Sequence, residues 1–165
     1  MLIFEKDLPK KLDYLELWYI LCNMGKSINK FYVYELFTNA KNHLVLYSID
    51  NTKVDIKNCP CGLIYTIVKN ENENEINIYI MFIATEYRYR KVGYASIFIN
   101  EFITFIKEKY GKKFKNISII LDSIETAVTF YEQFGFKWTT TEDKHNSIFN
   151  IDETNVNEHF IMVYK

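Results

Sequence analysis

The chain has 165 residues, 48% of them hydrophobic and 17% aromatic, so it is long and apolar enough to fold around a buried core. Its formal net charge of −1 excludes the basic excess typical of general nucleic-acid binders. With only 5 glycines and 2 prolines there is little room for flexible linkers, and we expect one domain over residues 1–165.

The N-terminal part predicts one strand and two helices. Residues 2–5 form a short edge strand, and apolar positions recur with helical spacing over residues 12–22 and 29–37. The start of the chain lacks the order of basic, apolar and small residues found in signal peptides, and no apolar run is long enough to cross a bilayer. We therefore expect a soluble, intracellular and cytoplasmic protein with no membrane partner.

The next segments predict strands over residues 43–49, 62–68 and 76–84, the last two joined by a polar hairpin over residues 69–75. Cys59 and Cys61 flank Pro60 ahead of the second of these strands. A structural zinc site needs about four ligands, and no second Cys pair or His pair lies nearby in the sequence. We expect no metal.

The stretch from Ile76 to Ile106 organises the chain. An apolar strand leads into a short basic loop that carries Arg88, Arg90 and Lys91, and Gly93 opens a long helix. A helix that begins in this way offers unpaired backbone N–H groups and the positive end of its dipole. This geometry favours a bound phosphate or diphosphate, although a solvated basic turn between two core elements has the same pattern.

The C-terminal part predicts a strand over residues 117–121, parallel to the strand at 76–84 because a helix connects them. Asp122 or Ser123 is expected to cap the next helix, which ends at Gly135 in a left-handed conformation. Strands over residues 136–140 and 160–164 close the chain around a long polar loop, 141–159. The expected fold is a three-layer α/β/α domain with a mixed, largely antiparallel sheet of six to seven strands.

Two motifs in this order resemble the GNAT superfamily of acetyl-CoA-dependent N-acetyltransferases. The first is Arg or Gln, two residues, Gly, one residue, then Gly or Ala, which Arg90, Gly93 and Ala95 satisfy. The second is Ala, then Tyr four residues later and Gly-Phe shortly after, which Ala127, Tyr131 and the pair Gly135-Phe136 satisfy. The resemblance covers the chain from about Leu44 to its C-terminus.

The resemblance implies an acetyltransferase that uses acetyl-CoA as co-substrate. The backbone N–H groups of the loop and the helix start would hold the diphosphate, and the end of the fourth strand would orient the acetyl carbonyl. Tyr131 would protonate the departing thiolate as general acid, although a core-packing role for this tyrosine stays open. The cofactor-binding residues implied in this way are Met81, Phe82, Ile83, Arg88, Arg90, Lys91, Val92, Gly93, Tyr94, Ala95 and Ser96.

The chain departs from the family pattern at three points. A register of the loop motif that starts at Arg88 puts Lys91 where Gly is expected, so we prefer the register from Arg90. Ile124 stands where many relatives have an Asn that bonds the cofactor. The fourth strand has no Asp or Glu to act as general base, and the nearby candidates are Glu75, Glu86, Asp122 and His159.

We therefore predict an N-acetyltransferase that acts by direct attack of a primary amine in a ternary complex. The amine is a small amine, a polyamine or a protein or peptide amine, and the enzyme is a monomer or homodimer. The amine substrate would enter beside the two early helices and the 141–159 loop. Acidic residues of this loop can attract a cation: Glu142, Asp143, Asp152, Glu153 and Glu158. The main alternative is a non-catalytic acyl-CoA-binding or protein-interaction module with the same fold. A nucleotide-binding domain is disfavoured because no phosphate-loop or dinucleotide glycine pattern is present.

Overall fold

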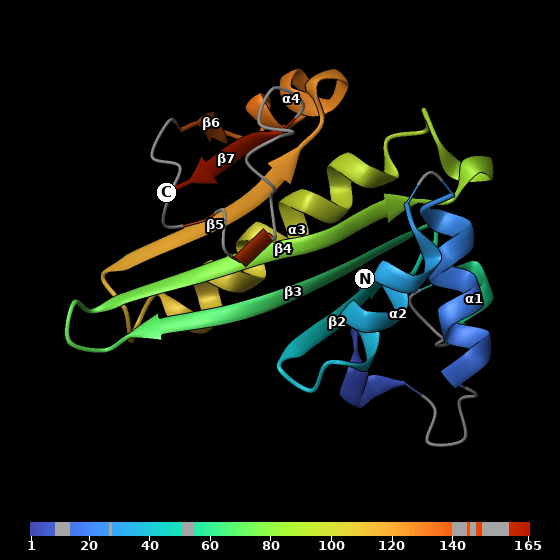
Figure 1. Cartoon of the computed structure of the whole chain (residues 1–165), viewed down its shortest axis with the longest axis horizontal. Helices are drawn as coiled ribbons and strands as arrows, with labels where there is room; N and C mark the ends of the chain where they lie inside the picture. Colours follow the sequence, from blue (N-terminus) through green and yellow to red (C-terminus); the bar gives the residue numbers. More distant parts are fainter. Residues whose placement is uncertain (9–13, 27, 51–54, 140–144, 146–147, 150–158) are drawn as a thin grey trace. The chain divides into compact units, whose positions relative to one another are not determined.

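A computed structural model describes residues 1–8, 14–26, 28–50, 55–139, 145, 148–149 and 159–165 (Figure 1). The main elements in chain order are β1 (Leu2–Phe4), α1 (Tyr14–Met24), α2 (Lys30–Thr38), β2 (Asn42–Tyr47), β3 (Cys61–Asn70), β4 (Glu75–Thr85), α3 (Tyr94–Tyr110), β5 (Asn116–Ser123), α4 (Glu125–Glu132), β6 (Lys137–Trp138) and β7 (Phe160–Tyr164). This order of strands and helices confirms the order expected from the sequence.

The strands form a mixed seven-stranded sheet in the order β1-β2-β3-β4-β5-β7-β6. β4 and β5 are parallel, as the intervening helix predicted, whereas the β1–β2, β2–β3, β5–β7 and β6–β7 pairs are antiparallel. The contacts divide the chain into two compact units, Met1–Thr66 with Phe82–Ile106 and Ile67–Met81 with Lys107–Lys165. β3, β4 and α3 each contribute residues to both units.

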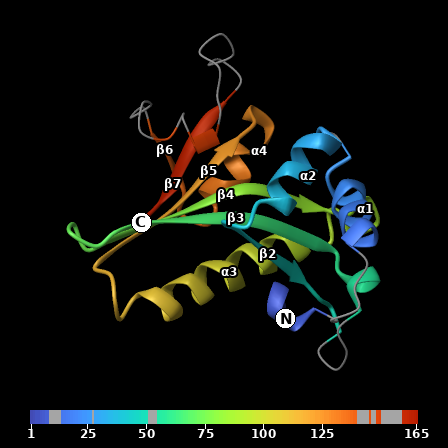
Figure 2. The same cartoon turned by 60° about the horizontal axis from the view of Figure 1, so that its bottom comes forward.

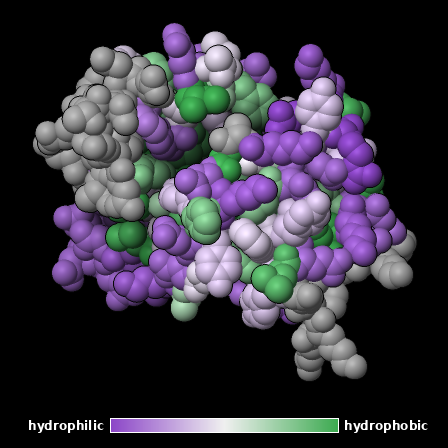
Figure 3. All heavy atoms as spheres, turned by 45° about the vertical axis from the view of Figure 1, so that its right-hand side comes forward, coloured by the Kyte–Doolittle hydropathy of each residue, from purple (hydrophilic) through white to green (hydrophobic). Residues whose placement is uncertain are grey.

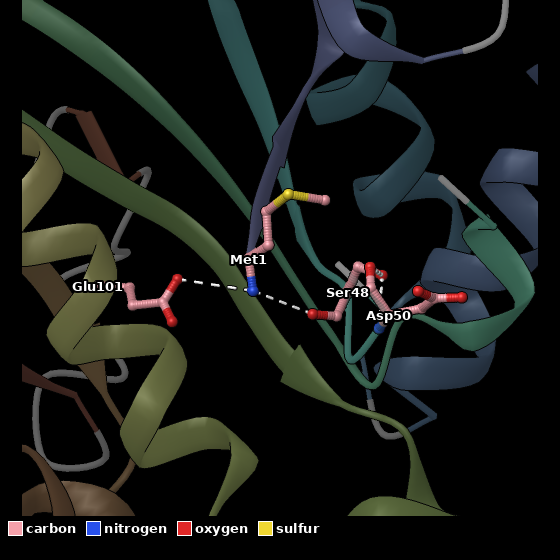
Figure 4. Close-up of polar contacts among 4 residues, drawn as sticks. All are labelled: Met1, Ser48, Asp50 and Glu101. Atoms are coloured by element: carbon pink, nitrogen blue, oxygen red, sulfur yellow. Dashed lines mark hydrogen bonds and ion pairs between the residues drawn. The ribbon is translucent and has the colours of Figure 1, made fainter. Parts of the chain in front are cut away.

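In the first unit, α1 and α2 pack side by side (Figure 2). The Trp18 indole N–H donates to the Lys30 carbonyl across this pair, and the Asn29 side chain caps α2 by accepting from Phe31 N–H at 2.9 Å. The Met1 amino group donates to the Ser48 carbonyl at 3.0 Å and lies 3.8 Å from the Glu101 carboxylate on α3 (Figure 4). These contacts hold β1 against both β2 and α3.

In the second unit, β4, β5 and β7 are neighbours in the sheet and give it two distinct faces (Figure 1). On one face, Tyr79, Ile120 and Ile161 form a buried cluster on which Met81 and Val163 pack. On the other face, the Tyr164 ring contacts the Phe136 ring after α4, and the Tyr164 hydroxyl accepts a hydrogen bond from the Lys107 ammonium of α3. Alternation along each strand assigns every other residue to the same face.

The structure corrects two local expectations. Neither Asp122 nor Ser123 caps α4, because β5 continues to Ser123 and Ile124 takes the N-cap position with no side-chain hydrogen bond. Of the strand expected over residues 136–140, the described residues up to 139 form strand only at Lys137–Trp138, and residue 140 lies outside the described residues. Gly135 has a φ of +93°, in agreement with the predicted left-handed turn after α4. Within the described residues, no helix is both long enough and apolar enough to span a membrane.

Candidate functional site

The loop between β4 and α3 is fixed to the first unit by backbone and side-chain contacts. Glu86 N–H donates to the Pro60 carbonyl at 2.8 Å, and residues Tyr87–Tyr89 then form one turn of 3-10 helix. The Arg88 guanidinium makes a bidentate contact with the Glu86 carboxylate, at 2.6 and 3.1 Å. Part of the positive charge expected for an anion site is therefore offset by a neighbouring carboxylate.

The motif predicts Arg90 as a cofactor contact. In the structure, its guanidinium binds backbone carbonyls of the protein itself. Its Nε donates to the Thr85 carbonyl at 3.1 Å and its Nη2 to the Met24 carbonyl at 3.4 Å. The guanidinium also lies 5.7 Å from the centroid of the Tyr87 ring. Arg90 thus joins the end of β4 to the last turn of α1 and sets the path of the loop.

The next residues carry the feature that was expected to hold a phosphate. Lys91 and Gly93 both have positive φ angles, +63° and +92°, just before α3 begins at Tyr94. Among the described residues, none accepts a hydrogen bond from the backbone N–H groups of Lys91 to Ser96, and the first such bond is Ile97 N–H to Gly93 O. A Cβ on Gly93 would have no neighbour within 4 Å, so the backbone here borders open space.

The aromatic neighbours of this segment give it a firm base. Tyr94 packs edge-on against Tyr89 and also contacts Tyr47 of β2, with ring centroids 5.8 and 6.3 Å apart. Val92 is 63% exposed, whereas Ala95 and Ser96 are half-buried. The helix start therefore combines a fixed backbone with N–H groups that have no described acceptor, which is an arrangement suited to an anion.

The predicted carbonyl-orienting residues Met81, Phe82 and Ile83 all lie in β4. Phe82 is buried, and a Cβ built on Gly25, just after α1, would come within 2.8 Å of its ring, so a larger residue there would displace that ring. Met81 and Ile83 are half-buried. Met81 directly follows Ile80, whose pairing with Leu121 is the last of the β4–β5 ladder.

Tyr131 lies on α4 in the second unit and is 9% exposed. Its ring packs edge-on against Phe130 and Phe136, at centroid distances of 5.3 and 5.9 Å. Burial raises the pKa of its phenol to about 12, so the hydroxyl keeps its proton at neutral pH. A protonated phenol in an apolar environment matches the predicted proton donor, and the aromatic packing matches the core role that was left open.

The four candidate bases lie in different environments. Glu75 accepts from the Asn77 amide at 2.9 Å, and Glu86 is paired with Arg88. Asp122 and His159 are brought together, with 2.7 Å between Oδ2 and Nδ1. Burial raises the pKa of Asp122 above its ordinary value, although the hydrogen bond from His159 acts in the opposite direction.

One further polar pair escaped the sequence analysis. The Tyr79 hydroxyl lies 3.0 Å from Nδ1 of His145, on the face of the second unit that also carries Met81. Burial raises the pKa of Tyr79 as well. No sequence signal joins these two residues, which are 66 positions apart.

Several large apolar side chains of α1 and α2 are exposed in the first unit. Figure 3 presents the face that carries α1, where apolar side chains are interspersed with polar ones. The large exposed apolar residues of these two helices are Tyr14, Leu15, Tyr19, Phe31 and Tyr34. The core-packing role expected for both helices holds for their other sides, where Leu17, Leu21 and Val33 are buried.

Comparison with known families identifies the fold and its chemistry. Residues 25–152, most of the chain, match the family described as the acetyltransferase (GNAT) domain. This chain belongs to the GNAT acetyltransferase family. It is accordingly an acetyl-CoA-dependent acyltransferase, and the two motifs around Gly93 and Tyr131 were read correctly as signs of this family.

Solved structures of other GNAT proteins share the fold at low sequence identity. Arabidopsis thaliana Naa50, in complex with the bisubstrate analogue CoA-Ac-MVNAL, matches with a TM-score of 0.60 and 16% identity, covering 99% of this chain and 98% of that one. Tetrahymena GCN5 matches at 0.62 and 12%, covering 94% and 91%. The Escherichia coli ribosomal-protein-S18-alanine N-acetyltransferase matches at 0.57 and 14%, covering 99% and 92%. A search of curated protein sequences finds no match.

Proposed function

We propose that this GNAT protein transfers acetyl from acetyl-CoA to a primary amine by direct attack in a ternary complex. The observation that carries the proposal is the segment from Lys91 to Ser96, whose backbone N–H groups have no acceptor among the described residues. Two positive φ angles shape this segment ahead of the 17-residue helix α3. A diphosphate gains both hydrogen bonds and the helix dipole at such a place.

The loop side chains support this role in different ways. Arg90 holds the loop through backbone carbonyls, so its contribution is to shape the site. Arg88 is already paired with Glu86, which leaves the Lys91 ammonium and the main-chain N–H groups as the groups we assign to the diphosphate. The remaining predicted contacts, at Val92, Tyr94, Ala95 and Ser96, are main-chain contacts in this proposal.

Two further groups act on the thioester in this proposal. The backbone of Met81 to Ile83 orients the acetyl carbonyl and stabilises the negative charge that develops on its oxygen. The Tyr131 hydroxyl donates its proton to the departing thiolate, and its raised pKa keeps that proton available across the neutral range.

The acceptor in this proposal is a primary amine, and peptide amines are the acceptors to test first. The matched Naa50 structure holds an analogue that links CoA to a peptide, and the matched bacterial enzyme is named for the alanine of a ribosomal protein. The exposed aromatic side chains of α1 and α2 offer apolar contacts beside which a peptide can lie. The acidic loop residues assigned to cation attraction in the sequence analysis lie outside the described residues. The single domain over residues 1–165, the monomeric or homodimeric state and the cytoplasmic location stay predictions.

Calorimetry with acetyl-CoA and a thiol-release assay test the proposed function. The amine panel comprises a peptide with a free α-amino group, the same peptide acetylated at its N-terminus but carrying an internal lysine, and spermidine. We expect saturable binding of acetyl-CoA and amine-dependent thiol release with at least one acceptor. Binding without release on the whole panel would favour the non-catalytic module, and no binding at all would refute the assignment of the segment from Lys91 to Ser96.

A further inference from the structure

We propose that His159 is the general base that removes a proton from the acceptor amine, and that Asp122 is the residue that positions it. This inference rests on the proposed amine acetylation. It supplies the base that the fourth strand lacks, from two residues 37 positions apart in the sequence.

The geometry of the pair defines which ring nitrogen acts. Nδ1 of His159 lies 2.7 Å from Oδ2 of Asp122. A carboxylate only accepts hydrogen bonds, so Nδ1 carries the proton and Nε2 of the neutral ring has a free lone pair. Among the described residues no group bonds Nε2, and the His159 side chain is 35% exposed. The imidazole therefore presents a proton acceptor toward solvent in a fixed orientation.

Asp122 is held in an unusual position for a carboxylate. Its side chain is only 19% exposed, and within the described part of the chain nothing bonds its buried Oδ1. Burying a carboxylate with one oxygen unpaired is costly, and the fold of a small domain keeps such a group only where something compensates for the cost. Stabilising the imidazolium that forms on proton uptake is a compensation that this contact provides.

The pair lies at the same end of the β4–β5 ladder as Met81. Asp122 follows Leu121, the last β5 residue paired with β4, just as Met81 follows Ile80 on β4. Asp122 pairs with Ile161 of β7, and His159 precedes that strand. Neighbouring strands lie about 4.8 Å apart, so His159 lies about 10 Å from β4 at this end of the sheet. In this proposal the amine nitrogen reaches the imidazole directly or through one bridging water.

The two residues that transfer protons in this proposal lie on opposite faces of the sheet. Met81 packs with Ile120 and Ile161 on one face, and alternation places Asp122 and His159 on that same face. Tyr131 packs with Phe136, which contacts Tyr164 on the opposite face. The attacking nitrogen and the departing sulfur are different substituents of the tetrahedral carbon, so in this proposal a separate group serves each of them.

The reaction balances with these two groups. The ammonium gives one proton to Nε2 of His159, and the neutral nitrogen then forms its bond to the carbonyl carbon. Collapse of the tetrahedral intermediate breaks the C–S bond, and the thiolate takes the Tyr131 proton. The second proton lost by the nitrogen restores the Tyr131 hydroxyl through solvent, and the proton on His159 returns to water. One proton is released for each amide formed.

Other titratable groups are less suited to the role of base. Glu86 is tied to Arg88, and Glu75 lies at the opposite end of the β4–β5 ladder. On the elements packed against β7, the described charged groups are Asp122 of β5, Lys137 of β6, and Glu125 and Glu132 of α4. Asp122 is the one in contact with the imidazole. His145, joined to Tyr79, is the remaining rival and enters the test.

The test compares kcat against pH, at saturating amine and acetyl-CoA, for wild type and four variants. Proton transfer by a positioned base contributes about 10²–10⁴-fold, so we expect His159→Gln to lose this factor in kcat while its acetyl-CoA affinity, measured by calorimetry, is kept. The variant should also lose the acid limb of the wild-type pH profile. Asp122→Asn should lower kcat without raising the KM for the amine, because the imidazole loses the carboxylate that orients it. His145→Gln and the surface control His43→Gln should retain the wild-type profile.

Added imidazole gives a second measurement on His159→Ala, where the vacated space admits a free base. Partial recovery of kcat with imidazole supports the proposal. A His159→Gln enzyme with the wild-type kcat and profile would overturn it, as would loss of the acid limb in His145→Gln alone. Wild-type protein that binds acetyl-CoA but acetylates no amine would instead remove the proposed function, and this inference with it.

Discussion

At the scale of single residues, Tyr131 offers the sharpest test of the chemistry. Phenylalanine keeps the ring that packs on Phe130 and Phe136 and removes only the hydroxyl. For Tyr131→Phe we expect kcat to fall by about 10²–10⁴-fold with acetyl-CoA affinity kept, because the thiolate then leaves without a positioned proton donor. A thiol-release assay measures kcat, and calorimetry measures the affinity for acetyl-CoA. Tyr110→Phe, at the end of α3, is the control, and an unchanged rate in Tyr131→Phe would assign that residue to core packing alone.

Two glycines separate a backbone requirement from a ligand requirement. Gly93 and Gly135 have nearly equal positive φ angles, +92° and +93°, so alanine costs about 1–2 kcal/mol of stability at either position. A Cβ on Gly93 projects into open space beside the free N–H groups, whereas one on Gly135 meets Tyr164 at 3.4 Å. We expect both variants to lose similar stability in urea melts, but only Gly93→Ala to bind acetyl-CoA more weakly in calorimetry. Equal affinities would remove Gly93 from the binding site.

The buried thiols predict how stability responds to alkali. Burial raises the pKa of Cys59 to about 12 and that of Cys61 to about 11. Below about pH 8.5 both the folded and unfolded chains keep these protons, and above it only the unfolded chain releases them. The free energy of unfolding should therefore decline from about pH 8.5 upward, and less steeply in Cys59→Ala/Cys61→Ala. Denaturant melts between pH 8 and pH 10 measure both slopes, and identical slopes would contradict the burial of the thiols.

At the scale of elements, the local sequence pattern is sufficient to predict a helix or strand that buries one face. The apolar positions of α3 gave its length and buried side, and polar Asn100 and Thr104 do face solvent. Helical spacing of polar residues predicts that Ser96 faces solvent together with Asn100 and Thr104, but Ser96 is half-buried and Ile97 is 45% exposed in its place. The start of α4 was also wrong, because a capping pattern at Asp122 and Ser123 cannot show that β5 uses both residues. Pairing with β7 made that choice, and β7 lies far along the chain.

A single substitution of Ile124, at the start of α4, should raise the stability of the chain. It occupies the N-cap position, is 63% exposed and provides no hydrogen bond to the first turn. Asparagine is among the best N-cap residues, and a good cap adds about 1 kcal/mol. We expect Ile124→Asn to unfold at higher urea concentration than wild type, whereas Ile124→Leu should match wild type. Equal midpoints for the two variants would show that α4 begins differently from the structure described.

At the scale of the whole molecule, the predictable part of the site is the part that is local in sequence. The loop from Arg88 to Ser96 is one contiguous stretch, so its motif was enough to propose a diphosphate site. The contacts that tie Arg90 to Met24 and Asp122 to His159 span 66 and 37 positions, and only the fold creates them. Sequence motifs therefore point to where the cofactor binds, whereas the groups that handle the amine's protons depend on strand order.

Binding of the coenzyme should be visible in the stability of the whole chain. A ligand that binds only the folded state at 100 times its Kd adds about 2.7 kcal/mol, which corresponds to a rise of about 5–10 °C in Tm for a domain of this size. Acetyl-pantetheine lacks the diphosphate. At the same concentration it should raise Tm far less, because the backbone N–H groups from Lys91 to Ser96 then have no diphosphate to bind. Scanning calorimetry compares the two ligands directly. Equal shifts would place the affinity in the pantetheine arm, and the absence of any shift with acetyl-CoA would leave the helix start without its ligand.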